Sequence, residues 1–161
     1  MITIVEANKI IKDFQEQAPV DVLKIAQALG LRVYKYSKWP DDISGMIKKD
    51  KEIGGNAGFA IFVNANHHLN RQRFTVAHEI AHYVYHVDEI GDAITDDALY
   101  RSSLSDAKES MANKYAAEIL MPWSLIKKEM EKGRKSLTEL AKIFEVSESA
   151  IALRFGVPSN D

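Results

Sequence analysis

Apolar residues spaced three and four positions apart predict that most of this chain is helical. The predicted helices lie at residues 7–17, 21–29, 71–86 and 105–120, with further helices across 123–155. We expect Asn70 to cap the third of these helices and Pro122 to end the fourth. Near the end of the chain, Ser136 and Glu139 form an S-x-x-E capping box that predicts the start of another helix.

Three shorter segments are rich in β-favouring residues and predict strands at 31–36, 45–49 and 59–64. The sequence DKEIGGNAG, between the second and third strands, is rich in turn-forming residues and predicts a hairpin. Residues 88–103 are acidic and are expected to be irregular. Helices around one small, mostly antiparallel sheet give an α+β fold class.

Composition limits the kinds of protein that this chain can be. Its 161 residues are 46% hydrophobic and include no cysteine, so one core can form without disulfides and any metal must be held by His, Asp or Glu. A net charge of -2 gives no general attraction to nucleic acid, so no direct nucleic-acid partner is expected. No apolar run approaches the roughly 20 residues that cross a bilayer, and no apolar signal core is visible. We therefore expect a cytoplasmic protein without a membrane partner.

One motif indicates metal chemistry. His78, Glu79 and His82 form H-E-x-x-H inside the predicted helix at 71–86. Four residues subtend about 400° on a helix, so the two imidazoles project from one face, one turn apart, and can share a Zn²⁺ ion. Glu79 projects about 100° further round, where its carboxylate can accept a proton from a water beside the metal. We interpret Glu79 as the catalytic base.

The third metal ligand is harder to assign. His86 continues the series, but it lies about 12 Å along the helix axis from His78, so it is expected beside the ligand set. Asp88 occupies the third-ligand position of a longer zinc motif, but that motif needs glycine where this chain has Tyr85. Two more histidines precede the helix on a polar loop and are expected to be solvated, His67 and His68.

The stronger candidates are Glu109 and Glu118, which share the next predicted helix. They are nine positions apart and therefore face opposite ways. Asn113, one turn from Glu109, shares its face. Spacing alone does not choose between the two glutamates.

Three segments resemble the ImmA/IrrE family of zinc metallopeptidases. RQRFTVAHEIAHYVYH is similar to the family's R-x-R-F-T-x-A-H-E-[LI]-x-H, and ESMANKYAAEILMP to its E-x-x-A-N-x-[FY]-A-A-x-x-L-[ML]-P. The strand AIFVN and the opening PVDVLKIAQALGLRVYKY also resemble the family. The combination covers most of the chain and is far more specific than H-E-x-x-H alone.

This resemblance implies a zincin-like fold with H-E-x-x-H on a central helix. It implies one Zn²⁺ per chain with Glu109 as the third ligand beside His78 and His82. The implied function is a zinc-dependent endopeptidase whose protein substrate is a helix-turn-helix repressor, so that cleavage relieves transcriptional repression. We interpret residues 1–133 as the metallopeptidase domain and residues 134–161 as a small helical subdomain that packs on it.

The strand before the motif helix is expected to border the substrate cleft. As an edge strand it could pair with an extended substrate through main-chain hydrogen bonds. Because the run is apolar throughout, a central strand buried on both faces is the alternative. The predicted substrate-binding residues are Phe59, Ala60, Ile61, Phe62 and Val63.

Two other functions compete with peptide hydrolysis. SLTELAKIFEVSESAIALRF has the rhythm of a DNA-binding helix-turn-helix, but its second helix offers Glu148 and a single basic residue, Arg154. A recognition helix normally presents several basic or amide side chains. A non-catalytic, zinc-stabilised binding module would keep the two histidines without needing Glu79. Because Glu79 is present, we favour hydrolysis.

Overall fold

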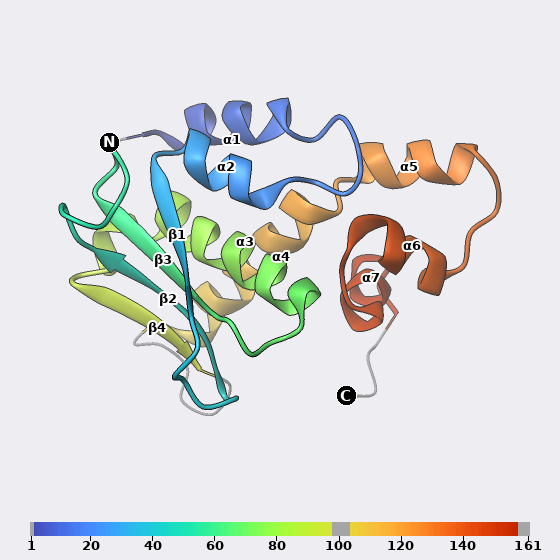
Figure 1. Ribbon diagram of the computed structural model, residues 1–161. Coiled ribbons are helices and arrows are strands. Elements are labelled where there is room, and N and C mark those ends of the chain that lie inside the picture. Colours follow the sequence, from blue (N-terminus) through green and yellow to red (C-terminus); the bar gives the residue numbers. More distant parts are fainter. Residues whose placement is uncertain (1, 98–103, 158–161) are drawn as a thin grey trace.

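The computed structural model describes residues 2–97 and 104–157 and has the α+β, zincin-like architecture expected from the sequence. Four strands form one sheet in the order β1-β3-β2-β4. In Figure 1 the sheet lies on one side of the molecule and helices α5 to α7 lie on the other, with α3 between them. The strands are β1 (Leu31–Tyr36), β2 (Ile43–Lys49), β3 (Phe59–Asn64) and β4 (Ala93–Asp97). The helices are α1 (Ile4–Asp13), α2 (Val22–Ala28), α3 (Leu69–Tyr85), the 3-10 turn η1 (Val87–Glu89), α4 (Asp106–Leu120), α5 (Trp123–Glu131), α6 (Leu137–Phe144) and α7 (Glu148–Arg154).

The hairpin predicted from the turn residues is confirmed. Strands β2 and β3 pair antiparallel, with Lys49 opposite Phe59. The Asp50 carboxylate accepts hydrogen bonds from the backbone N–H groups of Glu52 and Ile53, at 2.9 and 3.2 Å. Those two bonds favour the ionised carboxylate and lower the pKa of Asp50. The turn is therefore fixed by the kind of local side-chain contact that its sequence indicates.

The expectation that Phe59–Asn64 is an edge strand is wrong. Strand β3 pairs with β1 in parallel and with β2 in antiparallel fashion, so both of its edges are occupied. Five of its six residues are buried, as in a strand covered on both faces. An extended substrate cannot add to β3, and the proposed role of Phe59, Ala60, Ile61, Phe62 and Val63 in main-chain pairing is withdrawn.

The acidic stretch expected to be irregular contains a fourth strand. Strand β4 pairs antiparallel with β2, and the register shifts between Ile43 and Gly45. Its sequence, AITDD, ends in aspartates, which strands disfavour, and so gave no clear strand pattern. Two parts of the sequence predictions, residues 98–103 of this stretch and 158–161 of the C-terminal subdomain, lie outside the described residues.

Helix α3 is the central element of the fold. It packs against the sheet strands β2 and β3 and against α4, and eleven of its 17 residues are buried. Its N-cap is His68 and not the predicted Asn70, because the His68 ring accepts a hydrogen bond from the Asn70 backbone N–H at 3.0 Å. The Asn70 side chain instead donates to the Val146 carbonyl at 3.3 Å.

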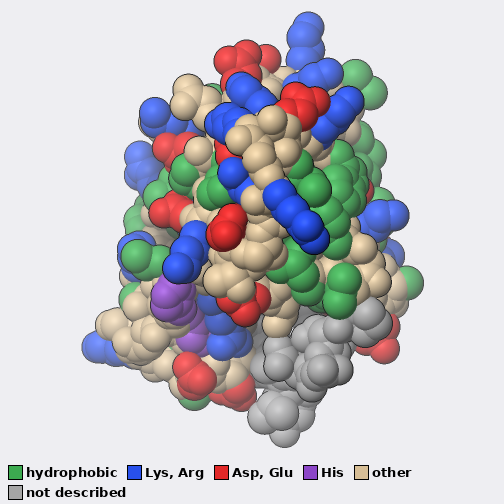
Figure 2. Space-filling model, turned by 90° about the vertical axis from the view of Figure 1, so that its right-hand side faces the viewer, with side chains coloured by type: hydrophobic (Ala, Val, Ile, Leu, Met, Phe, Trp, Pro, Cys, Tyr) green, Lys and Arg blue, Asp and Glu red, His purple; other side chains and the backbone are tan. Residues whose placement is uncertain are grey.

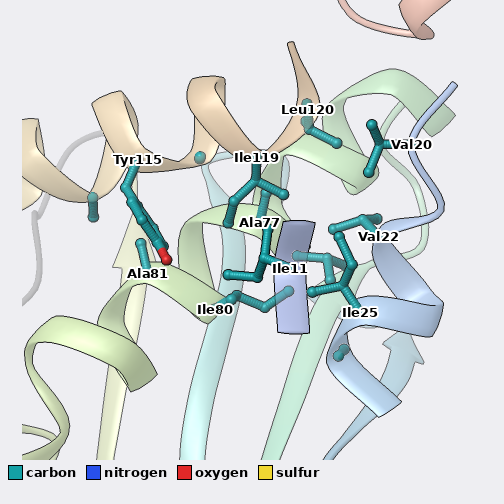
Figure 3. Packing of buried hydrophobic residues seen from close by; sticks show 14 of the residues in the cluster. Ile11, Val20, Val22, Ile25, Ala77, Ile80, Ala81, Tyr115, Ile119 and Leu120 are labelled. Atoms are coloured by element: carbon teal, nitrogen blue, oxygen red, sulfur yellow. The ribbon is translucent and has the colours of Figure 1, made fainter. Parts of the chain in front are cut away.

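The hydrophobic core lies between α3 and the elements around it. Ile80 and Ala77 of α3 meet Ile25 of α2 and Ile119 of α4, and each is at most 1% exposed. Figure 3 shows these side chains pointing toward one another from three helices. Burying an aliphatic side chain of this size contributes roughly 1.5–3 kcal/mol. Packing of one face of α3 in this core therefore fixes the position of the face that carries the H-E-x-x-H motif.

The C-terminal helices contact α3 and the end of α4 through polar groups. Arg73 donates to the carbonyls of Phe144 and Glu145, both at 3.2 Å, at the end of α6. The Nε of Arg154 donates to the Met121 carbonyl at 2.9 Å. Within the described ranges, no helix combines the length and apolar character needed to cross a membrane.

Candidate metal centre

Three potential ligands from two helices converge at one point. Helix α3 places the His78 and His82 rings one turn apart, with ring centroids separated by 4.6 Å. Helix α4 packs against α3 and brings Glu109 to them. The Nε2 of His78 is 3.0 Å from Glu109 Oε2, and the Nε2 of His82 is 3.3 Å from Oε1. One ligand atom from each residue lies within 4.8 Å of the other two, and all three side chains are buried.

The other nitrogen of each imidazole also has a defined partner. His78 Nδ1 is 2.8 Å from Asn113 Oδ1, and His82 Nδ1 is 3.0 Å from His86 Nδ1. An amide oxygen only accepts, so the His78 Nδ1–H donates to it and Nε2 keeps its lone pair toward Glu109. A ligating histidine usually has its second nitrogen fixed in this way. Asn113 therefore selects the tautomer that can ligate through Nε2.

Glu79 lies next to this group and is fully buried. Neither carboxylate oxygen has a hydrogen-bond partner within the part of the chain that the structure describes. A buried carboxylate without partners is costly, because nothing replaces the water that it has lost. Such a group is expected where a bound water, a metal or a substrate is its partner during function.

Strand β2 passes close to this carboxylate because Gly45 has no side chain. A Cβ added at Gly45 would lie 2.4 Å from the Thr75 methyl group, 2.8 Å from the Phe62 carbonyl oxygen and 3.7 Å from Glu79 Oε1. The first two distances are too short for real contacts. Glycine therefore allows the sheet to approach α3 beside the carboxylate.

Burial favours the neutral form of two imidazoles at the site, His82 and His86. Desolvation lowers the pKa of His82, which outweighs the opposite effect of the Glu109 carboxylate beside it. Desolvation likewise lowers the pKa of His86, and the neighbouring His82 adds to the decrease. The neutral imidazole is the form that binds metal, because its free lone pair is the donor.

These donors fit a metal ion of the zinc type. Two imidazole nitrogens and one carboxylate oxygen form a three-ligand set that catalytic zinc sites use, with the fourth position left for water or substrate. Cysteine is absent, so sites for ions that require thiolate ligands are excluded. The burial of both rings and their fixed Nδ1 partners suit metal binding through both Nε2 atoms.

The structure also locates the rival ligands. Asp88 is exposed on η1, outside the group of three ligands. Glu118 lines a different cavity, between α4 and α1. His86 is not one of the three candidate ligands but contacts one of them, His82, as its distance along the helix predicts. His67 was expected to be solvated, but it is buried, with Nε2 2.8 Å from the Asp41 carbonyl oxygen.

Sequence reasoning did not assign the contact between Asn113 and His78. The signal was present: Asn113 follows Glu109 by four positions and therefore shares its face of α4. It could not be interpreted without knowing that this face meets α3.

Comparison with known proteins agrees with the fold and the motif. Residues 26–155 match peptidase family M78, described as the IrrE N-terminal-like domain, and the chain belongs to this family. It is similar to the radiation response metalloprotease IrrE of Deinococcus radiodurans, with 41% identity over 96 residues that span 56% of this chain and 28% of that protein.

A solved structure described as a Mycobacterium tuberculosis transcriptional regulator has the same fold. The TM-score is 0.63 at 16% identity, covering 96% of this chain and 46% of that one. At this identity the likeness concerns the fold alone. The chain thus spans less than half the length of each of these two relatives.

Proposed function

We propose that this protein is a zinc-dependent endopeptidase in which His78, His82 and Glu109 hold one Zn²⁺ and Glu79 is the general base. The observation that supports this most directly is the fully buried Glu79 carboxylate, which has no hydrogen-bond partner among the described residues and lies beside three converging candidate ligands. A site that only stabilised the fold would need the ligands but would gain nothing from a buried, unpartnered carboxylate. Membership of a peptidase family supports the same reading.

In this proposal each residue has a separate task. The Nε2 atoms of His78 and His82 and the Glu109 carboxylate position the ion, while Asn113 and His86 orient the two rings through Nδ1. Bound Zn²⁺ supplies Lewis-acid chemistry, which polarises a peptide carbonyl and acidifies water. Glu79 accepts the proton that water loses as it attacks the carbonyl, and it returns a proton to the departing amine. Its dry surroundings strengthen both transfers.

The proposed substrate is a helix-turn-helix repressor, so that the activity would relieve repression in the cytoplasm. The resemblance to the ImmA/IrrE family supports this choice. The C-terminal helices are poorly suited to bind DNA themselves, since the single basic side chain of α7, Arg154, is engaged within the protein. It donates to Met121 and lies 4.6 Å from the centre of the Trp123 ring.

The test of catalysis is the Glu79→Gln variant. An amide cannot accept the proton of water, so we expect zinc content and thermal stability to remain while kcat/KM falls by about 10²–10⁴-fold. Glu118→Gln is the matched control, since this carboxylate lines a cavity apart from the ligands, and it should retain full activity. Substantial turnover by zinc-loaded Glu79→Gln protein would exclude the general-base role.

The test of the substrate is co-expression with helix-turn-helix repressors encoded near this protein, followed by mass spectrometry of fragments. We expect one repressor to yield two new termini in the presence of the wild-type chain and none with Glu79→Gln. If hydrolysis of other proteins depends on Glu79 while every tested repressor remains intact, the peptidase assignment stands and the substrate class is wrong.

A further inference from the structure

A groove whose lining includes none of the three candidate metal ligands runs between α3, α4 and the C-terminal helices. Its volume is about 700 Å³. One wall is the first half of α3, another is the middle of α4, and the third is the α6–α7 turn with α7. It is the space that the C-terminal helices enclose when Arg73 and Asn70 tie the end of α6 to α3.

The lining of this groove is apolar with a basic rim. Its hydrophobic surface includes Phe74 and Ala117, together with Leu153, whose side chain remains 60% exposed. Lys114 and Arg154 are among the basic residues that line it, and none of the lining residues within 2–97 and 104–157 is acidic. Figure 2 views the side on which α5 to α7 lie and shows hydrophobic side chains gathered beside Lys and Arg side chains. A large exposed leucine beside basic side chains is typical of a surface that another molecule covers.

The groove reaches the proposed metal centre through a single side chain. Asn113 lines the groove, and its Oδ1 accepts from His78 Nδ1 at 2.8 Å. Phe74, on the groove wall, precedes His78 by one turn of α3. A chain segment bound in the groove would therefore contact residues that lie next to His78, one through its side chain and one through a single turn of α3.

The walls of the groove determine which kind of segment fits. Among the described residues, every wall is a helix or a helix–helix turn, so these walls offer no strand edge to pair with an extended peptide. Recognition must then use side chains, which suits a helix whose own backbone groups are already bonded. The basic rim favours acidic side chains at the borders of its apolar stripe.

We propose that this groove docks an amphipathic helix with acidic flanks that belongs to the protein substrate. This inference rests on the proposed function, since it assigns the groove as the place where the substrate is held while a neighbouring segment reaches the metal. It gives the C-terminal helices a role in substrate selection.

Binding can be measured without cleavage. The probe is a fluorescein-labelled peptide of about 18 residues that places leucines at i, i+3, i+4 and i+7 and glutamates on both borders of that stripe. A second peptide replaces each glutamate by lysine, and a third has the first composition in scrambled order. The zinc-loaded Glu79→Gln chain is titrated with each while fluorescence anisotropy is recorded. We expect the acidic helix to bind and each of the other two to bind at least about tenfold more weakly, which is about 1.4 kcal/mol.

Two variants locate the binding surface. Lys114→Glu reverses a charge on the rim, and Leu153→Asp places a charge on the apolar surface of the groove. Each should weaken binding of the acidic peptide about tenfold. The matched controls are Lys127→Glu on α5 and Val5→Asp on α1, both exposed and outside the groove lining, and they should leave the affinity unchanged.

Several results would overturn the docking proposal. Equal binding of the acidic and lysine peptides would show that charge does not select the ligand. If both groove variants bind the acidic peptide as tightly as the chain without these changes, the peptide binds elsewhere. Failure to bind the acidic peptide, with a concentration-dependent dimer in sedimentation that Leu153→Asp abolishes, would show that a second copy of this chain covers the groove. Because binding is measured in protein that cannot cleave, its failure leaves Glu79-dependent hydrolysis standing, and loss of hydrolysis leaves the binding result standing.

Discussion

The Oδ1 atom of Asn113 lies 2.8 Å from Nδ1 of His78, on the side of the ring opposite the Nε2 that faces Glu109. In the proposed metal centre, helix α4 thus supplies both a ligand and the group that orients another ligand, four residues apart on one face. Any shift of α4 along α3 would disturb both contacts together. Packing between these two helices therefore sets the geometry of the proposed metal centre.

From this relationship we predict that Asn113→Ala weakens zinc binding by about 10–100-fold, the usual effect of removing a partner of a ligating histidine. The ring of His78 would lose the acceptor that fixes its tautomer, while the fold should persist because Asn113 is exposed. Competition with a fluorescent chelator measures the affinity. Asn113→Asp, which keeps an acceptor, should retain most of it. If Asn113→Ala binds zinc as the wild type does, the orienting role is wrong.

The two glutamates of α4 should behave differently toward metal. Glu109→Ala removes one of three converging ligands, so we expect purified protein to lose its stoichiometric zinc. Glu118→Ala is the control, because that side chain faces the cavity beside α1. Elemental analysis of both variants after dialysis decides the matter. Zinc lost from the Glu118 variant and kept by the Glu109 variant would reverse the assignment.

Gly45 should tolerate no side chain. Its added Cβ would meet the Thr75 methyl at 2.4 Å and the Phe62 carbonyl at 2.8 Å, so Gly45→Ala must push β2 away from α3. We expect a loss of about 1–3 kcal/mol in the free energy of unfolding measured in urea. Thr75→Ser in the same chain should recover part of this loss by removing the methyl group.

The control for Gly45 is Gly91→Ala. Gly91 has a positive φ of 57° but open space around its Cβ position, so only backbone strain applies there. We expect this variant to lose about 1 kcal/mol in the free energy of unfolding. Its affinity for zinc should not change. A Gly45→Ala protein as stable as wild type would show that the sheet can move away from α3 without cost.

Arg73 should hold the C-terminal helices on α3. Its guanidinium donates to the carbonyls of Phe144 and Glu145, and burial lowers its pKa, although it remains charged at neutral pH. We expect Arg73→Ala to reduce the free energy of unfolding by about 2 kcal/mol, the contribution of hydrogen bonds from a charged donor. Hydrogen exchange should show faster exchange in α6 and α7. Arg134→Ala, exposed between α5 and α6, should change neither measurement.

The amino-acid sequence by itself determined what depends on neighbours along the chain. The Ser136 cap, which accepts from the Glu139 N–H at 3.1 Å, and the turn at Asp50 follow from local hydrogen bonding. Local spacing also predicted where the helices lie, although α1 spans Ile4–Asp13 and not residues 7–17. The facing of His78 and His82 is also local, because a helix repeats every 3.6 residues. Resemblance to a known family then selected Glu109 where spacing left Glu118 open.

Only the tertiary structure decided which partner lies beyond each local element. The apolar run of β3 is compatible with an edge or a centre, and its place was fixed by pairing with β1, far away in sequence. Strand β4 forms because β2 offers it a partner, although its acidic sequence disfavours a strand. The contact of Asn113 with His78 and the groove beside it arise from helices that meet across 35 residues of chain. Such contacts depend on packing over the whole core, which no short window of sequence encodes.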